Sequence, residues 1–242
     1  MSVVKYSDYD INEVDFENIS ATGKKKTSQA IWFPLYSGER SPMIQIPKIE
    51  LTSYGIPTKC EFYKEDYQRN FIKLPLDTTK PEIQSFISWL QKLDEKLNKK
   101  EIKEKVFGKK NPKCSYQSVL RTPMTEDGKP KSDKLPYIKV KFMTKYPTGE
   151  ITTPVIIQCS DGQKRLAHDA DSIEDVLDLI KFKSKVKCIL IPSKLWIIPP
   201  SGGDAMYGLS FKLAKVLVEQ PPEKIVTPES IIEGFIESDK ED

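Results

Sequence analysis

Alternation of apolar and polar residues predicts β-structure, most clearly in the middle of the chain. From Tyr137 to Phe142 the apolar residues face one side of a strand, and Lys139 and Lys141 face the other, about 7 Å apart along it. Turn residues from Pro147 to Glu150 follow, and the apolar run from 151 to 158 can pair back. We therefore predict a hairpin across these two runs.

Further strands are predicted wherever short β-branched and aromatic runs lie between turn residues. Prolines bracket these runs, as expected because proline donates no hydrogen bond to a strand ladder. The two longest runs, 185 to 198 and 207 to 218, are joined by a Pro- and Gly-rich segment and predict a closing hairpin. The shorter runs are 28 to 36, paired with 43 to 47, then 58 to 63 and 70 to 74.

Helical spacing is found in two stretches. Pro81 opens a long helix that extends to Val106, with apolar residues mainly three to four positions apart. Its other face mixes lysines with acids, including Asp94, and this mixture indicates a solvated face more often than a binding footprint. The second helix begins at Ser172, and Asp175 three residues later forms a capping-box pattern.

Helices that do not alternate with the strands favour an antiparallel architecture over a βαβ sheet. The predicted fold is mainly β, an OB-like antiparallel barrel with one long and one short inserted helix, and the alternative is a β-sandwich. We expect a mobile N-terminal arm over 1 to 27 and one core domain over 28 to 220, with a helical insertion at 80 to 106. An acidic flexible tail is expected over 221 to 242.

The net charge of +3 conceals an uneven distribution. Between Lys92 and Lys145, sixteen Lys and Arg stand against seven Asp and Glu. From Pro228 to Asp242 there are six acids and one lysine. The basic body suits an anionic partner such as nucleic acid, and the acidic end can compete with that partner or dock onto replication proteins.

Residues that carry catalysis or hold metals form no recognisable pattern. His168 is the only histidine, and the four cysteines, at 60, 114, 159 and 188, lack ligand spacing. The sequence has no Walker loop, no dinucleotide fingerprint, no zinc-protease motif and no nucleophile elbow. We therefore expect no enzyme, cofactor or metal, and four reduced thiols. With no targeting segment and no apolar run of roughly 20 residues, we expect no membrane contact and a cytosolic location.

The candidate nucleic-acid site combines lysines on strand faces with nearby rings. Lysines neutralise phosphates and release counterions, and bases stack on exposed rings. A single lysine can merely keep a strand edge soluble, and a ring in an apolar strand is more often core, so the prediction depends on the cluster. Trp196 and Phe211 are further rings near the lysines. The predicted binding residues are Lys113, Arg121, Lys139, Lys141, Lys212, Lys215, Tyr116, Tyr137, Tyr146 and Tyr207.

Several segments resemble the OB-fold single-stranded DNA-binding proteins of the nucleocytoplasmic large DNA viruses. The segments are Pro42 to Pro47 with Tyr54-Gly55, Val186 to Trp196, and Tyr207 to Val218. The resemblance covers roughly 28 to 220 and rests on strand patterns, without a residue-level binding motif. It implies an OB barrel that binds single-stranded DNA cooperatively during viral replication, in viral factories of the host cytoplasm.

Two other functions stay open at this point. A virion structural or capsid-associated protein with a β-sandwich would share the β content and the many prolines, although it would need an apolar contact patch more than a basic segment. An accessory factor of replication or transcription would act through the acidic tail. The expected partners are single-stranded DNA, with RNA as the alternative, and replication proteins at the tail, with self-association left open.

Overall fold

The computed structural model describes residues 3–13, 42–107, 114–159, 162–198 and 205–220 of the 242-residue chain. Ten strands form one mixed sheet, with four helices and two 3-10 turns, Tyr6–Asp8 and Ile11–Glu13, beside it. The strands are β1 (Val3–Lys5), β2 (Met43–Gln45), β3 (Ile49–Glu50), β4 (Phe71–Pro75), β5 (Cys114–Gln117), β6 (Tyr137–Phe142), β7 (Val155–Gln158), β8 (Lys164–Leu166), β9 (Lys185–Ile198) and β10 (Ala205–Glu219). The helices are α1 (Asp66–Arg69), α2 (Pro81–Leu97), α3 (Lys100–Phe107) and α4 (Ile173–Leu179).

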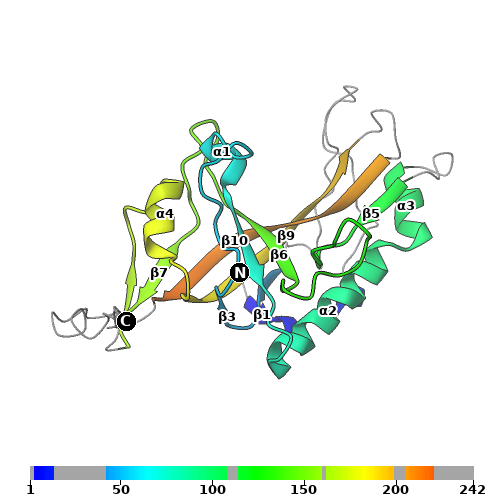
Figure 1. Cartoon of the computed structure of the whole chain (residues 1–242), viewed down its shortest axis with the longest axis horizontal. Helices are drawn as coiled ribbons and strands as arrows, with labels where there is room; N and C mark the ends of the chain where they lie inside the picture. The colour runs from blue at the N-terminus through cyan, green and yellow to red at the C-terminus, as the bar shows by residue number, and fades with distance from the viewer. Residues whose placement is uncertain (1–2, 14–41, 108–113, 160–161, 199–204, 221–242) are drawn as a thin grey trace, which may run out of the picture.

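The two longest strands, β9 and β10, form an antiparallel ribbon that runs through the molecule (Figure 1). The predicted closing hairpin is thus confirmed. On its other edge β10 pairs in parallel with three strands in succession, β5, β6 and β7. The β9–β10 register shifts twice, between Ser210 and Phe211 and between Leu213 and Lys215. Every other strand reaches the sheet through this ribbon or through a strand paired with it.

The predicted antiparallel barrel is wrong. The sheet is mixed, and its main order is β1-β2-β9-β10-β6-β4, with no pairing between β1 and β4 among the described residues to close it. The predicted hairpin of 137–142 with 151–158 is also wrong, because β6 pairs with β4 and β10 and β7 pairs with β10 and β8. The bridge between Thr144 and Ile151 lies beyond the end of β6. Buried Thr153 redirects the chain: its hydroxyl accepts from the Met143 amide and donates to the Leu213 carbonyl, both at 2.8 Å. Pairing therefore passes from β6 to β10.

The local helix signals predict the starts of the helices well. Pro81 opens α2, and Ser172 caps α4 with the expected reciprocal hydrogen bonds to Asp175. The single long helix that the sequence predicts is two helices in the structure, since α2 ends at Leu97 and α3 begins at Lys100. Residues 58–63 form a turn closed by a bridge and not a strand. No helix in the described part of the chain is long and apolar enough to span a membrane.

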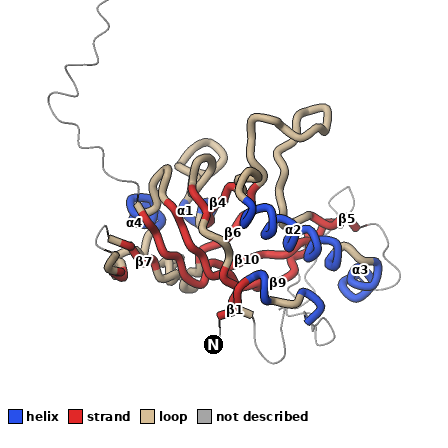
Figure 2. Tube along the Cα trace, turned by 90° about the horizontal axis from the view of Figure 1, so that it is seen from below, coloured by secondary structure: helices blue, strands red, loops and turns tan. Residues whose placement is uncertain are grey.

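Helix α2 covers one face of the sheet and buries an apolar stripe against it. In Figure 1 it lies below the strands, whereas α1 and α4 lie above them. Figure 2, seen from below, shows α2 and α3 toward one end of the molecule and α1 and α4 toward the other. Residues 3–13 pack beside α2, where the Tyr6 ring contacts Phe86 at 5.1 Å between centroids and Lys96 donates to the Ile11 carbonyl at 2.6 Å. The prediction of a mobile arm is therefore wrong for residues 3–13. Residues 14–27 and the tail over 221–242 lie outside the described residues. The stripe consists of Ile83, Phe86, Leu90, Leu93 and Leu97.

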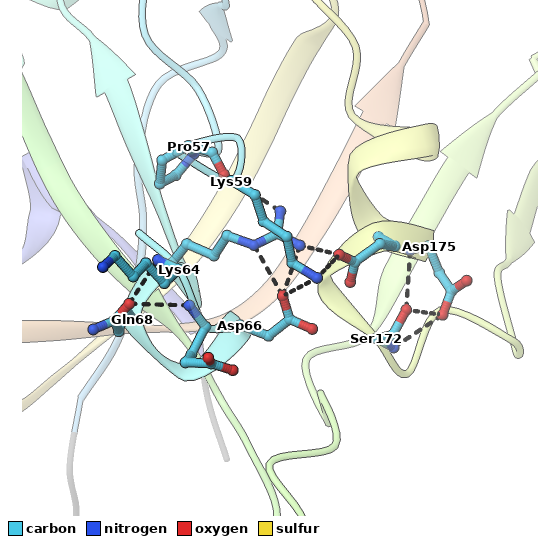
Figure 3. A network of polar contacts seen from close by, with 10 residues as sticks. Pro57, Lys59, Lys64, Asp66, Gln68, Ser172 and Asp175 are labelled. Carbon is cyan, nitrogen blue, oxygen red and sulfur yellow. Dashed lines mark hydrogen bonds and ion pairs between the residues drawn. The ribbon is translucent and has the colours of Figure 1, made fainter. Parts of the chain in front are cut away.

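A buried arginine joins α1 to α4 at the far end of the sheet. Arg69 is 2% exposed, and its guanidinium bonds to Asp66 at 2.7 Å and to Glu174 on α4. Lys59 bridges the same two carboxylates from outside, at 3.3 Å each. Figure 3 shows this network between Lys59 and Asp66, the first residue of α1, on one side and the helix that carries Asp175 on the other. The pairing fixes α4 against the β3–β4 connection.

Replacing Arg69 should test this junction. We expect Arg69→Ala to lower the free energy of unfolding by about 3 to 5 kcal/mol, because it removes a buried guanidinium from two carboxylates and leaves a cavity. Urea denaturation followed by circular dichroism measures the change. Lys59→Ala is the matched control, since this exposed lysine contacts the same carboxylates and should scarcely shift the melting temperature. Equal losses in both variants would contradict the assignment.

Candidate nucleic-acid interface

The face of the sheet opposite α2 carries a row of cations. In β6, Ile138, Val140 and Phe142 are buried on the core side, so the strand alternation places Lys139 and Lys141 on the other side, where both are exposed. This confirms the predicted orientation of the two lysines.

Neighbouring strands extend that row. In β4, Lys73 lies opposite Lys139 in the antiparallel register, and Phe71 lies opposite Lys141. In β10, Lys212 is the parallel partner of Lys141 and is also exposed. Three adjacent strands thus present lysines at facing positions.

A fifth cation, Arg121, is held at the same face by the segment that follows β5. Its amide and carbonyl exchange hydrogen bonds with Tyr137, both at 2.9 Å. Its guanidinium is half-buried, and burial lowers its pKa without removing the charge. We refer to Lys73, Arg121, Lys139, Lys141 and Lys212 as the basic face.

Asp94 of α2 fixes the segment that leads to Arg121. This carboxylate is 9% exposed and accepts hydrogen bonds from the Val119 amide at 2.8 Å and the Leu120 amide at 3.2 Å. It also accepts from the hydroxyls of Tyr116, at 2.7 Å, and Ser118. Asp94 therefore has a structural role, and its predicted place on a solvated helix face is wrong.

Aromatic rings lie among the cations. Tyr137 packs against Tyr54 with 4.8 Å between ring centroids, and the Lys73 ammonium lies 5.3 Å from the Tyr137 centroid. The Lys139 ammonium lies 3.7 Å from the centroid of the buried Phe71 ring. Cation–π contacts of this kind hold the lysines close to the sheet and limit where their charges can move.

The cations of the basic face form no direct ion pairs within the described residues, and only Arg121 has a carboxylate, that of Asp94, near enough to oppose the lowering of its pKa by burial. None of its five cations forms an ion pair with a carboxylate there, and none of their side chains donates a hydrogen bond to a protein group. Although the Lys139 side chain reaches solvent, the surrounding protein desolvates its ammonium. This desolvation, with repulsion from Lys141, Lys73 and Arg121, lowers the pKa of Lys139 to about 8. Desolvation and then Lys212 also lower the pKa of Lys141.

A hollow of about 290 Å³ opens beside these cations, in the stretch of β10 between its partners β5 and β6. Trp196 forms one wall. Its indole lies over Gly208, where an added Cβ would come within 2.6 Å of the ring. The hollow is lined by Gln117, Arg121, Lys139, Lys141, Trp196, Ile198, Leu209, Ser210 and Phe211.

Half of the predicted site residues meet at this face. Lys139, Lys141, Lys212, Arg121 and Tyr137 lie together as described above. Lys215 is exposed on β10 beyond the second register shift, and Tyr146 is 94% exposed in the turn after β6. Lys113 lies outside the described residues. The binding roles of all these residues stay predictions.

Tyr207 and Tyr116 do not belong to this face. Tyr207 is fully buried, and its hydroxyl donates to the Leu97 carbonyl of α2 at 2.7 Å. Tyr116 is its parallel partner, half-buried, with the ring 5.1 Å from that of Tyr207 and the hydroxyl on Asp94. The expectation of exposed rings at these positions is therefore wrong, because the start of β10 and β5 lie against α2 and not at a free strand end.

Sequence reasoning missed three residues of the face, Lys73, Tyr54 and Phe71, and it also missed the pairing of Trp196 with Gly208. Lys73 stands in a predicted strand with apolar residues on both sides, and that pattern alone could have marked it as an outward lysine. Nothing in the local sequence indicates that Trp196 would pair with Gly208, since this depends on the β9–β10 register.

Comparison with known proteins gives a distant viral relative. No protein-family model matches the chain. An uncharacterized protein, R505, of Acanthamoeba polyphaga mimivirus is 26% identical over 239 residues, covering 86% of this chain. The chain spans only 58% of the length of that relative. This similarity agrees with the giant-virus part of the resemblance seen in the sequence.

Two solved structures of phage proteins show a weak likeness. One is gp2.5, a single-stranded DNA-binding protein encoded by bacteriophage T7, with a TM-score of 0.42 and 13% identity over 84% of this chain and 100% of that chain. The other is a single-stranded DNA-binding protein from bacteriophage Enc34, with a TM-score of 0.37 and 14% identity over 87% of this chain and 98% of that chain. Likeness at this level carries no weight in the argument below.

Removing the carboxylate of Asp94 should release the segment that carries Arg121. We expect Asp94→Ala to lower the free energy of unfolding by roughly 3 kcal/mol, because four donors lose a charged acceptor and two of them are buried or half-buried amides. Asp94→Asn should cost less, since one acceptor oxygen remains. Glu95→Ala, an exposed neighbour on the same helix, should stay within about 0.5 kcal/mol of the parent chain in the same denaturation experiment. A destabilisation no larger than that of Glu95→Ala would show that Asp94 is not the anchor.

Proposed function

We propose that this chain binds single-stranded DNA across the basic face, largely without sequence preference, and coats and protects single strands during viral DNA replication. The observation that carries the proposal is the set of five cations on one sheet face that form no ion pair with a carboxylate among the described residues.

Such an arrangement costs stability in the free protein. Like charges directly across a strand pair repel, as Lys73 does with Lys139. The pKa of Lys139 is lowered first by desolvation and then by this repulsion and that of Lys141 and Arg121. Phosphates spaced along a strand would relieve it and release counterions. A surface built in this way favours a polyanionic partner over plain solvent exposure.

Rings between the cations favour single strands over duplex. A single strand can turn its bases toward Tyr137 or Trp196 while its phosphates meet the lysines, whereas duplex bases are already stacked on one another. Aromatic stacking contributes about 1 to 3 kcal/mol per base without strong sequence preference. RNA offers the same groups, so DNA is the proposed partner because of the resemblance in the sequence.

The remaining parts of the proposal concern partners and place. We place the chain in the host cytoplasm, as a binding protein without catalysis, with replication proteins as partners of the acidic tail. A virion component is the alternative, but the large apolar side chains exposed among the described residues come from separate segments, such as Phe62, Met124 and Phe182. That scatter favours nucleic-acid binding.

Salt dependence tests the proposed interface. The logarithm of affinity for oligo-dT should fall linearly with the logarithm of salt concentration, by about 0.7 for each phosphate neutralised. The triple variant K139A/K141A/K212A should therefore lower the slope by roughly 2. Fluorescence anisotropy with labelled oligo-dT, oligo-U and duplex across a salt series measures this.

A charge-matched control separates the basic face from net charge. The variant K92A/K99A/K100A removes three exposed lysines from the α2–α3 region and should leave the slope nearly unchanged. Equal effects of the two triple variants would mean that the chain attracts nucleic acid only through its overall charge. No binding to oligo-dT at about 50 mM salt, where the electrostatic attraction is strong, would end the proposal.

Binding should also depend on pH near 8. Below its pKa of about 8 Lys139 is charged and can bind phosphate, and above it the free protein loses this charge. Bound phosphate raises the pKa of the lysine, so affinity should decline as pH rises from 7 through 9. Lys139→Arg keeps its charge over this range and should flatten the profile. A decline of the same size in the arginine variant would assign the pH dependence to other groups.

A further inference from the structure

The hollow beside the basic face differs from the rest of that surface, because it has an aromatic wall and apolar sides. The Trp196 indole rests on the backbone at Gly208, the one residue type whose missing side chain leaves room for it there. Leu209, Phe211 and Ile198 contribute apolar lining. A phosphate gains no favourable interaction from apolar walls, whereas a flat heterocycle can stack on an indole.

The volume also fits a group larger than solvent. About 290 Å³ is far above the share of about 30 Å³ that one water takes in the liquid. Lys139 and Lys141 of β6 also line the hollow, so phosphates next to an inserted base would lie within reach of their ammonium groups. A base in the hollow is therefore compatible with a backbone that follows the basic face.

Arg121 is the group best placed to read the edge of such a base. Its guanidinium is half-buried and lines the hollow, and it makes no hydrogen bond or ion pair with any residue that the structure describes. Its backbone is fixed by Tyr137 on one side and by the contacts of Asp94 with Val119 and Leu120 on the other. The guanidinium is thus partly desolvated and its donors are free to bond an acceptor that enters the hollow.

We propose that the hollow takes one base of the bound strand and that Arg121 makes this position select guanine. The guanidinium fork can donate two parallel hydrogen bonds to O6 and N7 of guanine, a pair of adjacent acceptors that adenine and thymine lack. Cytosine has such a pair in O2 and N3, but its smaller ring stacks less well on the indole than a purine does. Trp196 stacks on the base. The inference builds on the proposed function, since it assumes a bound single strand, and it adds one selective position to an otherwise tolerant surface.

The test compares oligo-dT with the same oligonucleotide carrying one central G, A or C, by fluorescence anisotropy at fixed salt. The single guanine should strengthen binding about tenfold, while adenine and cytosine should change it little. Arg121→Lys keeps the positive charge but loses the fork, and should remove the guanine advantage while oligo-dT still binds. Lys212→Ala is the matched control, because it should weaken binding to all four oligonucleotides by the same factor and leave the guanine advantage intact.

A second measurement does not depend on Arg121. Binding of the guanine oligonucleotide should quench tryptophan fluorescence in the parent chain, and Trp196→Phe should abolish most of that change while melting at a similar temperature. Equal affinity for the four oligonucleotides, or a preference for adenine, would overturn the inference and leave the proposed function intact. A guanine advantage that survives in Arg121→Lys would also overturn it. Failure to bind any single strand would contradict both the guanine inference and the proposed function.

Discussion

The site depends on the hydrogen bonds that Asp94 accepts from β5 and the segment after it. This carboxylate, on the sheet-facing side of α2, accepts hydrogen bonds from two amides and two hydroxyls. These bonds fix the conformation of the chain between β5 and Arg121. On the core side, the Tyr116 hydroxyl donates to Asp94 and the Tyr207 hydroxyl donates to the Leu97 carbonyl of α2. Arg121 lies on the opposite side of the sheet. The same contacts that seat α2 on the core thus determine where a cation stands on the basic face.

The rest of the basic face depends on the shared use of β10. Because β6 pairs with β10 and β4 pairs with β6, buried residues such as Val140 and Ile72 fix the strands in register, and the lysines on the other side follow. Apolar burial contributes about 1.5 to 3 kcal/mol for each fully buried large side chain, which is enough to hold facing lysines together against their repulsion. The core therefore stabilises a surface that would not assemble by itself.

Whether the sequence predicts a feature of the fold or site depends on how far apart in the chain the interacting residues lie. The orientation of Lys139 and Lys141 follows from alternation within six residues, and the start of α4 follows from Ser172 and Asp175. Tyr207 looked exposed because its flanks resemble a strand end, but its surroundings come from α2, more than a hundred residues earlier. Parallel pairing, the Trp196–Gly208 contact and the burial of Asp94 depend on register between distant segments, and no local pattern encodes them. The sequence thus predicts which residues face outward, and only the fold shows which of them meet.

The two register shifts in the β9–β10 ribbon have a geometric consequence. Each shift inserts an extra residue, and bulges of this kind increase the local twist of a strand pair. Both fall beside the stretch of β10 that pairs with β6. We therefore expect the added twist to rotate the three segments of β10 that pair with β5, β6 and β7 relative to one another. The exposed groups along β10 accordingly trace a winding course. Any polymer that touches them in order has to turn about its own axis as it advances, which a flexible chain does easily and a stiff rod does not.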